Sequence, residues 1–355
     1  MAAKVRKTLS IDTNNNGKKV TEYVISENPL DFYISEQTAS YGKKRPFSIY
    51  YDDPEHTVRL LKGDSIEILN QARESSVDMI FADPPYFLSN GGITCHAGKM
   101  VSVNKGGWDR SKGVKETHKF NLEWLKACKR VLKPNGTIWV SGTTHIIYSI
   151  GFAMQELEYK ILNEIIWYKR NAPPNLSCRY FTHSTETVLW AAKDKQSKHY
   201  FDYALMKQFN KGKQMRNLWQ FNGSDESEEV DNVWEISSPP SVEKTFGKHP
   251  TQKPAELLRR IILASTQEGN LVLDPFCGSS TTGVAAVLLN RKYVGMDMEE
   301  EYLELSRNRL QEAVNKRGLS CSGGIQALVK TKYEGVHPNT VILSSTILSD
   351  DHTTS

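Results

Sequence analysis

From about residue 57 onward, hydrophobic and polar positions follow two alternating periods. Short apolar runs bounded by turn residues predict strands, and apolar positions three and four residues apart predict amphipathic helices. Strands are predicted at 57–64, 77–83, 136–142, 161–169, 185–193, 270–274 and 292–297. Helices are predicted at 66–72, 121–136, 146–159, 253–266, 282–290 and 300–316, and Pro134-Asn135-Gly136 is expected to end the second of them. Alternation of the two element types is typical of an α/β domain.

Three segments lack this pattern and suggest how the chain is divided. Residues 1–50 are polar, which predicts an N-terminal extension, with a short docking segment at 46–51 as the alternative. Residues 193–247 hold basic and aromatic side chains followed by an acidic run, which predicts an insert. Residues 319–355 are predicted to be a C-terminal appendage. The α/β domain is then made of two halves, 51–192 and 248–318.

The composition favours a globular protein of the cytoplasm. Hydrophobic residues make up 39% of the chain and charged residues 24%. No apolar run approaches the roughly 18 residues of a membrane span, and no secretory signal is present at the N-terminus. The five cysteines include no CxxC pair, so we expect a reducing compartment and no metal site. The net charge of +4 favours an anionic partner only weakly.

The segment FADPPY, 81–86, joins a predicted buried strand to an acid and a stiff turn. The two prolines fix two φ angles directly after Asp83 and remove two backbone donors. Such a turn holds a carboxylate and a neighbouring carbonyl still for a ligand. A plain surface turn is the alternative, because Asp-Pro and Pro-Pro are common turn pairs.

A second segment, DPFCGSSTTG at 274–283, places a loop of small residues between a strand and a helix. Gly278 lets the backbone approach a ligand closely, and the start of the helix offers unpaired N–H groups to an anion. Asp297 ends the next strand, where an acid can hold two ribose hydroxyls. The segment predicts an adenosine-bearing cofactor, with a simple tight strand–helix turn as the alternative.

DPPY at 83–86, KHPTQKP at 248–254 and DPFCGSSTT at 274–282 occur in this order. Over residues 57–315 the sequence resembles the β-class amino methyltransferases of bacterial DNA. The resemblance implies DNA as partner, S-adenosylmethionine as cofactor, and an α/β fold with a doubly wound, mixed seven-stranded sheet. This is the Rossmann-like methyltransferase fold in its circularly permuted order. Residues 51–192 would be its catalytic half, 248–318 its cofactor-binding half, and the insert its target-recognition region.

Finer similarity is to the second adenine methyltransferase of DpnII-type restriction-modification systems. It rests on GKMVSVNKGGWDRS, APPNLSCRYFTHSTE and EKTFGKHPTQKP. This similarity implies methylation of adenine N6 at GATC. Homodimers are common in the class, and the resemblance leaves single-stranded DNA open as a further substrate.

The resemblance assigns the DPPY residues to catalysis. Asp83 would accept hydrogen bonds from the target amine, and the Pro84 carbonyl, fixed with the help of Pro85, would add a second acceptor. Tyr86 would stack on a base rotated out of the duplex. No covalent enzyme intermediate is required.

The resemblance also implies a set of cofactor contacts. These are Asp64, Lys253, Asp274, Phe276, Gly278, Ser279, Ser280, Thr281, Thr282 and Asp297. Helix capping is the alternative for Asp64 and Thr282, and core packing is the alternative for Phe276. His249 is expected to be a structural turn residue.

Three basic segments are expected to contact DNA: the loop just after the DPPY turn, the segment KRNAPPNLSCRY at 169–180, and the basic and aromatic part of the insert. Lys and Arg side chains there would meet phosphates, and a few would read base edges. The candidates are Lys99, Lys105, Trp108, Arg110, Lys169, Arg170, Arg179, Lys211, Lys213 and Arg216. Ordinary solvated loops are the alternative.

Ser280 departs from the family pattern, which has Gly-Ser-Gly-Thr-Thr in this loop. A serine strains the loop if the position needs a positive φ, although its hydroxyl can also join the binding network. Three other functions remain open: an N4-cytosine DNA methyltransferase, a non-catalytic DNA-binding regulator, and a nicotinamide-dependent dehydrogenase. The last leaves DPPY and HPTQKP unexplained.

Overall fold

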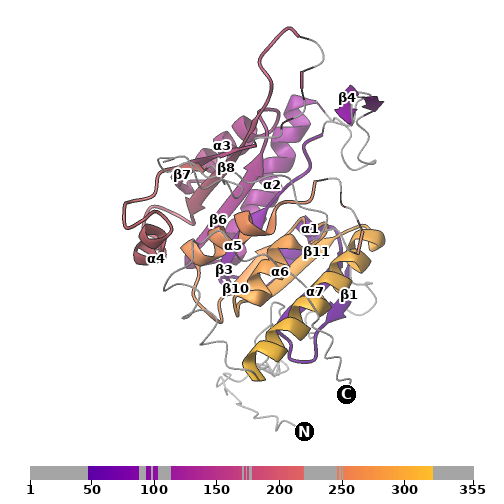
Figure 1. The fold of residues 1–355 in the computed structure, drawn as a ribbon, viewed down its shortest axis with the longest axis vertical. Helices are drawn as coiled ribbons and strands as arrows, with labels where there is room; N and C mark the ends of the chain where they lie inside the picture. Colours follow the sequence, from indigo (N-terminus) through magenta and orange to yellow (C-terminus); the bar gives the residue numbers. More distant parts are fainter. Residues whose placement is uncertain are drawn as a thin grey trace, which may run out of the picture.

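One mixed β-sheet forms the frame of the protein (Figure 1). The computed structural model describes residues 47–87, 93–96, 99–102, 113–169, 172, 174–175, 178–219, 246–247, 249 and 251–322. In these residues the sheet has nine strands in the order β1-β2-β11-β10-β3-β6-β8-β7-β9. The strands are β1 (Phe47–Asp52), β2 (Val58–Gly63), β3 (Val77–Ala82), β6 (Leu132–Gly142), β7 (Lys160–Tyr168), β8 (Thr185–Ala192), β9 (Leu218–Trp219), β10 (Leu271–Asp274) and β11 (Lys292–Asp297).

The five strands from β2 to β6 in this order run parallel, and β8 is antiparallel to both β6 and β7. Parallel strands covered on both faces are near-continuous apolar runs. Strand β10, LVLD, fits this rule because all four of its residues are buried. The parallel strands are therefore at the centre of the domain, whereas β7, near one end of the strand order, has exposed residues such as Asn163 and Glu164.

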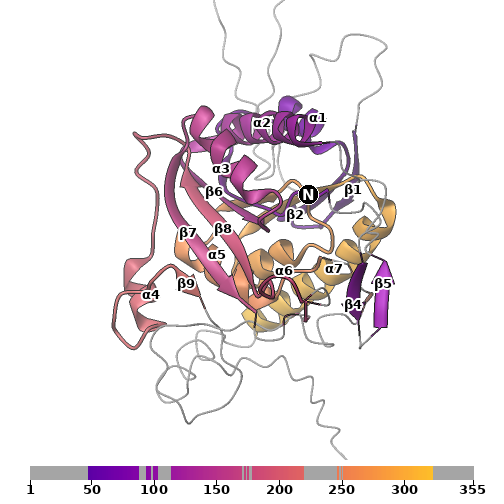
Figure 2. The same ribbon diagram turned by 90° about the horizontal axis from the view of Figure 1, so that it is seen from above.

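Helices cover both faces of the sheet (Figure 2). On one face lie α1 (Ser65–Gln71), α2 (Val114–Val131) and α3 (Ile147–Glu156), with Trp124 and Ile150 in that core. On the other lie α5 (Ala255–Ser265), α6 (Thr281–Leu288) and α7 (Glu300–Ser322), with Ile261 and Leu310 in the second core. The predicted doubly wound α/β fold is confirmed.

The sheet has two edge strands beyond the seven predicted. Strand β1, which overlaps the alternative docking segment at 46–51, pairs antiparallel with β2. Strand β9 pairs with β7 at the other edge. The short helix α4 (Tyr203–Gln208) lies in the predicted insert. Its Met206 and the following Phe209 are buried against Ala264 of α5, so this part of the insert packs onto the domain.

The predicted end of the second helix is wrong. Helix α2 ends at Val131, and residues 132–136 already belong to β6. Leu132 is fully buried and pairs with Val77 of β3, which favours extended backbone over another helical turn. The register shifts between this pair and the next, Met79 with Thr137. Such a bulge accommodates Pro134, which has no N–H for a ladder bond.

A small two-stranded sheet follows the DPPY turn, made of β4 (Ile93–His96) and β5 (Lys99–Ser102). The candidate DNA contact Lys99 lies in β5. Lys105, Trp108, Arg110 and Arg170 lie outside the described residues. Helix α7 extends to Ser322, a few residues into the predicted C-terminal appendage. Among the described residues, no helix has both the length and the hydropathy needed to cross a membrane.

Four carboxylates gather at one edge of the sheet because the parallel strands end there. Asp274 and Asp297 are the last residues of β10 and β11. Asp64 and Asp83 directly follow β2 and β3. In open α/β sheets, ligands bind in the crevice beyond the carboxyl ends of the strands. This edge is therefore the expected position of the site.

Candidate active site

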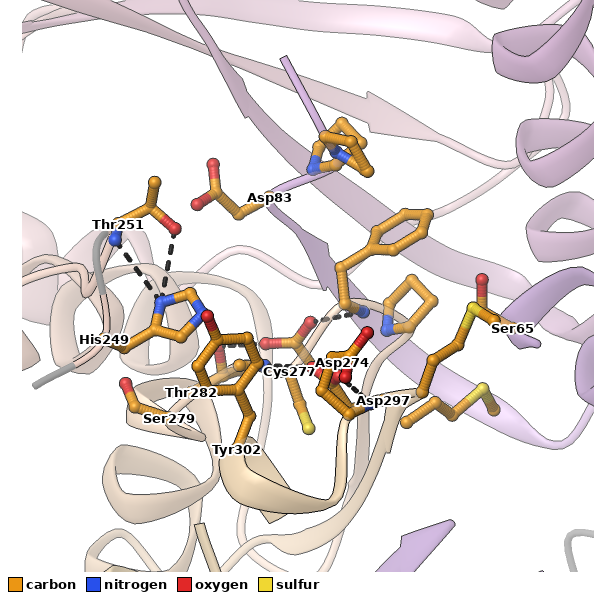
Figure 3. A pocket seen from close by; sticks show the side chains of 18 of the residues that line it. Ser65, Asp83, His249, Thr251, Asp274, Cys277, Ser279, Thr282, Asp297 and Tyr302 are labelled. Atoms are coloured by element: carbon orange, nitrogen blue, oxygen red, sulfur yellow. Dashed lines mark hydrogen bonds between the residues drawn. The ribbon is translucent and has the colours of Figure 1, made fainter. Parts of the chain in front are cut away.

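A cavity of about 610 Å³ opens at the carboxyl ends of the parallel strands (Figure 3). Asp83 and the residues after it line one side, and Gly278 and its neighbours line another. The DPPY turn and the loop around Gly278, far apart in the sequence, therefore face one cavity, as the sequence predicts. Among the described residues, no group of three or more His, Cys, Asp or Glu side chains is placed to bind a metal ion.

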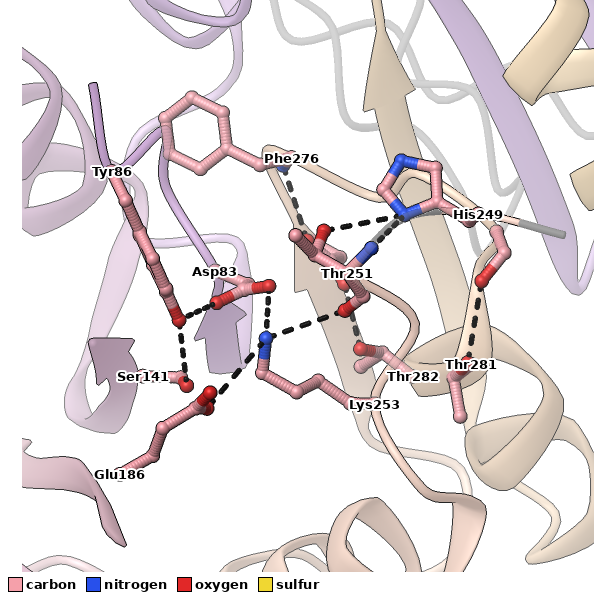
Figure 4. Close-up of polar contacts among 12 residues, drawn as sticks. Asp83, Tyr86, Ser141, Glu186, His249, Thr251, Lys253, Phe276, Thr281 and Thr282 are labelled. Carbon is pink, nitrogen blue, oxygen red and sulfur yellow. Dashed lines mark hydrogen bonds and ion pairs between the residues drawn. The ribbon is translucent and has the colours of Figure 1, made fainter. Parts of the chain in front are cut away.

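The carboxylate of Asp83 is engaged at both oxygens (Figure 4). The Tyr86 hydroxyl donates to Oδ1 at 2.7 Å, and the Lys253 ammonium forms an ion pair with Oδ2. Burial, followed by the charge of Asp83, raises the pKa of Tyr86 well above its usual value. Tyr86 is therefore a neutral hydrogen-bond donor, and it fixes the orientation of the Asp83 carboxylate.

Lys253 lies against Asp83 and borders the cavity, although the sequence grouped it with the cofactor contacts. Its ammonium also lies 4.0 Å from Oε2 of Glu186, at the start of β8. Burial acts to lower the pKa of Lys253, but the charges of Asp83 and Glu186 outweigh burial and raise it. Lys253 is thus a buried cation between two acids. Sequence reasoning missed Glu186; an acid at the start of an otherwise apolar strand was the available signal.

Asp274 holds the loop after β10 in shape. Its carboxylate accepts a hydrogen bond from the Phe276 backbone N–H at 3.1 Å and another from the Thr282 hydroxyl at 2.6 Å. Burial raises its pKa to about 7. Both predicted cofactor contacts, Asp274 and Thr282, border the cavity, and each has this structural role as well.

Gly278 is required by geometry. Its φ is +49°, and a Cβ at this position would lie 2.9 Å from the His249 ring. His249 itself contacts Tyr302 edge-on, with ring centroids 4.4 Å apart, and its Nδ1 lies 3.4 Å from the Thr251 N–H. The predicted turn role of His249 is consistent with this contact, and its ring also borders the cavity.

Ser280 has a φ of +50°, a left-handed backbone conformation that strains a serine. It is fully buried, and its Oγ accepts a hydrogen bond from the Tyr293 hydroxyl at 3.2 Å. Its neighbours Ser279 and Thr281 border the cavity, whereas Ser280 does not. The hydroxyl of Ser280 therefore bonds behind the loop rather than in the cavity.

Asp297 links the loop to the next strand. Its Oδ2 accepts from the Gly278 N–H at 3.0 Å, and its Oδ1 accepts from the Glu299 N–H at 2.9 Å. Burial raises its pKa to about 6. Asp297 borders the cavity, and its contact with a ribose stays a prediction.

Asp64 caps helix α1, which was the alternative to its cofactor role. Its Oδ1 accepts from the Ile66 and Glu67 N–H groups at 2.9 and 3.0 Å. Phe276 packs edge-on against Trp124, with ring centroids 5.5 Å apart. Both Asp64 and Phe276 also border the cavity, so the structural and the ligand-facing roles are compatible.

The predicted DNA contacts differ in their surroundings. Lys169 is ion-paired with Glu186 and lies over the Trp167 ring at 4.7 Å. Lys211, Lys213, Arg216 and Arg179 are exposed. The predicted contacts in the insert are thus exposed, whereas Lys169 is joined through Glu186 to Lys253 beside Asp83.

A protein-family model described as DNA methylase matches residues 77–308. The chain belongs to the DNA methylase family. The Type II methyltransferase M2.DpnII of Streptococcus pneumoniae is 52% identical over 272 residues, which cover 76% of this chain and 95% of that protein. M2.MboI of Moraxella bovis is 47% identical over 263 residues, covering 74% and 91%. The similarity to DpnII-type methyltransferases predicted from the motifs is confirmed.

Among solved structures, the PvuII DNA methyltransferase, described as cytosine-N4-specific, matches with a TM-score of 0.52. It is 21% identical and covers 74% of this chain and 92% of its own. At this identity the match speaks for the fold alone.

DNA is thus the substrate of this DNA methylase, and S-adenosylmethionine is the methyl donor of its family. The cavity suits this cofactor in three respects. Gly278 keeps the loop free of a side chain, the N-terminus of α6 opens beside it, and Asp297 supplies an acceptor at the end of β11. When bound, the cofactor supplies a methyl group on a positively charged sulfur.

Proposed function

We propose that this DNA methylase transfers the methyl group of S-adenosylmethionine to N6 of an adenine in GATC, as the modification enzyme of a restriction-modification system. One observation carries the proposal: Asp83, held at the end of β3, borders the same cavity as the glycine loop after β10. The choice of adenine and of GATC rests on the similarity to DpnII-type enzymes.

The chemistry needs acceptors more than it needs a strong base. The exocyclic amine of adenine is a poor nucleophile because its lone pair is conjugated into the ring. Asp83 and the Pro84 carbonyl accept its hydrogens and favour the pyramidal form, in which the lone pair is available. These acceptors are fixed before the reaction, so they stabilise the positive charge that develops on nitrogen. Tyr86, which borders the cavity, stacks on the rotated base.

The cofactor is held by residues of both halves. Thr281, Thr282 and the N–H groups that begin α6 bind its carboxylate, and Asp297 binds its ribose. Asp64 uses Oδ1 for both capping bonds, and its Oδ2 takes no hydrogen bond from the described residues. That oxygen accepts from the amino group of the cofactor's adenine, while Phe276 packs on the base.

DNA binds across the exposed basic groups of the insert. Lys211, Lys213 and Arg216 meet phosphates there, and Lys99 of β5 is a further contact to DNA. The protein works in the cytoplasm on double-stranded DNA as a homodimer. Sedimentation with and without DNA tests the dimer, and a single-stranded oligonucleotide in the methylation assay tests the second substrate.

N4-cytosine methylation uses the same acceptors, because its target is also a conjugated exocyclic amine. The deciding experiment is therefore methyl transfer from labelled cofactor to unmethylated DNA, followed by nucleoside analysis. N6-methyladenine is expected from the wild type, and none from Asp83→Ala or Asp83→Asn. Glu312→Gln, an exposed change on α7, serves as the matched control. N4-methylcytosine would overturn the adenine assignment, and binding without any methylation would favour a non-catalytic regulator.

A further inference from the structure

The ion pair between Asp83 and Lys253 presents a difficulty for the proposed reaction. Asp83 stabilises the positive charge that develops on the target nitrogen through its own negative charge. A buried ammonium in contact with its Oδ2 cancels much of that charge at short range. The arrangement therefore holds Asp83 in place but weakens it as an acceptor for the amine.

A second buried acid, Glu186, also lies close to the Lys253 ammonium. Oε2 of Glu186 lies 4.0 Å from the ammonium, and the side chains of Lys253, Asp83 and Glu186 are only 8%, 12% and 10% exposed. The Thr251 carbonyl, at 3.4 Å, is a further acceptor (Figure 4). Removing Lys253 from Asp83 without another partner would leave a buried charge uncompensated, which is costly. With Glu186 present, a short movement of the ammonium exchanges one carboxylate for the other.

The position of Glu186 is itself fixed by its surroundings. It lies in β8 opposite Trp167 of β7, and its Oε1 is ion-paired with Lys169. Asp83, Lys253, Glu186 and Lys169 thus alternate in charge from the catalytic turn to the end of β7. Such a row is neutral as a whole, so the exchange of Lys253 between its acids moves little net charge.

We propose that Glu186 is a positioning residue for methyl transfer: it takes Lys253 from Asp83 when the target amine arrives, and so frees Asp83 Oδ2 to accept the amine's hydrogen. The inference rests on the proposed role of Asp83. In this proposal Lys253 holds the Asp83 carboxylate in place before the target base enters. In the reacting complex the Lys253 ammonium moves from Asp83 to Glu186.

The test is a double-mutant cycle with Glu186→Gln and Lys253→Met, measured as single-turnover methyl transfer so that product release does not mask the step. Glu186→Gln keeps the size of the side chain and removes its charge. We expect the rate to fall by about 10- to 100-fold, with the affinities for DNA and cofactor within about twofold of the wild type. Glu186→Asp, which keeps the carboxylate, recovers most of the rate. Glu164→Gln on β7, an exposed position, is the matched control.

The cycle separates this role from a structural one. Because Glu186 acts through Lys253, Glu186→Gln is expected to add no further loss in the Lys253→Met background. A loss of equal size in both backgrounds, or a Glu186→Gln rate within twofold of the wild type, overturns the inference. The thermal midpoint of Lys253→Met shows whether this variant folds. If it does not, the rates of Glu186→Gln and Glu186→Asp still test the inference, because it requires a low rate in the first and a largely recovered rate in the second. Asp83→Ala in the same assay tests the proposed function itself, so the two failures are distinct.

Discussion

The backbone N–H of Gly278 donates a 3.0 Å hydrogen bond to Oδ2 of Asp297, which ties the loop after β10 to the end of β11. Gly278 makes this bond from a left-handed backbone, with φ of +49°, and the Asp297 carboxylate is the acceptor. The loop after β10 and the end of β11, which both belong to the predicted cofactor site, are therefore held together by a hydrogen bond. Changes at either residue are expected to act on cofactor binding before they act on DNA.

Gly278→Ala is expected to weaken S-adenosylmethionine binding by about 10- to 100-fold, because strain at a positive φ adds to a steric clash. The added Cβ would lie 2.9 Å from the His249 ring. Isothermal titration calorimetry measures the effect. Gly278→Ala combined with His249→Ala relieves the clash but not the strain, so it should recover part of the affinity. Full affinity in the single variant would contradict the predicted contact.

Ser280→Gly is expected to leave cofactor affinity within about twofold, because Ser280 bonds to Tyr293 behind the loop. The relief of about 1 kcal/mol of backbone strain is offset by the loss of a hydrogen bond worth about 1 kcal/mol. Tyr293→Phe loses the bond and keeps the strain, so it should destabilise by about 1 kcal/mol in urea unfolding. A large gain in cofactor affinity for Ser280→Gly would instead place Ser280 in the binding network.

Cofactor binding is expected to weaken as the pH falls through about 6, the pKa to which burial raises Asp297. The ionised carboxylate accepts from two ribose hydroxyls, and the protonated form loses acceptor capacity. Titrations between pH 5 and 8 measure the dependence. Asp297→Asn should bind more weakly at pH 8 and lose the step near 6; an unchanged step would assign it to another group.

The raised pKa values of the buried acids also make the stability of the folded protein depend on pH, in the direction opposite to cofactor binding. The pKa values of Asp274 and Asp297 are raised by burial to about 7 and about 6, above the value of about 3.9 in the unfolded chain. The folded protein therefore binds more protons between these values, and the contribution of the two groups to stability falls as the pH rises from about 4 to 7. Urea unfolding across this range, with Asp297→Asn as comparison, checks the sign. A larger fall in the variant than in the wild type would contradict it.

Tyr86→Phe and Tyr86→Ala separate the hydroxyl from the ring. The phenylalanine variant loses the 2.7 Å bond to Asp83 and the 3.4 Å hydrogen bond with the Ser141 hydroxyl, and its methylation rate should fall by about 3- to 10-fold. The alanine variant also loses stacking, so the rotated base should be less populated. A 2-aminopurine at the target position reports this as weaker fluorescence. Equal fluorescence in both variants would argue against stacking by Tyr86.

Replacing Lys211, Lys213 and Arg216 together by alanine should weaken DNA binding and leave cofactor binding unchanged. If all three meet phosphates, the slope of log affinity against log salt falls by about 3. Lys316→Ala on α7, an exposed lysine, is the control. An unchanged salt slope would remove this part of the insert from the DNA surface.

The positions of the DPPY turn and of the loop after β10 could be predicted from the sequence because their signals are local. Asp83, Gly278 and Asp297 each follow or end a short apolar strand, so strand ends alone bring them to one edge. The partners of Asp83 could not be predicted in this way. Lys253, two residues before α5, contacts Asp83, and Glu186 of β8 lies 4.0 Å from the Lys253 ammonium. The order of strands in the sheet brings these distant segments together.

The predicted end of the second helix failed for a similar reason. Pro134 and Gly136 carry a strong local turn signal, but Leu132 gains more by pairing beside Val77 and entering the core. Ser280 likewise carried an ambiguous signal, because its positive φ follows from the loop and its partner Tyr293 comes from the next strand. Tertiary contacts decided each case.

The position of β10 and β11 in the sheet order has a consequence for biosynthesis. In the described sheet, strands β1 and β2 form one part and β3, β6, β8, β7 and β9 form another, and β11 and β10 lie between them. Of the described strands these two are made last, so the inner edges of β2 and β3 lack their native partners at least while the ribosome adds residues 83–270. At usual elongation rates that interval lasts roughly 10–40 s. A nascent chain of this protein therefore exposes two apolar strand edges at its centre, and chains cut short before β10 are expected to aggregate or to be held by chaperones.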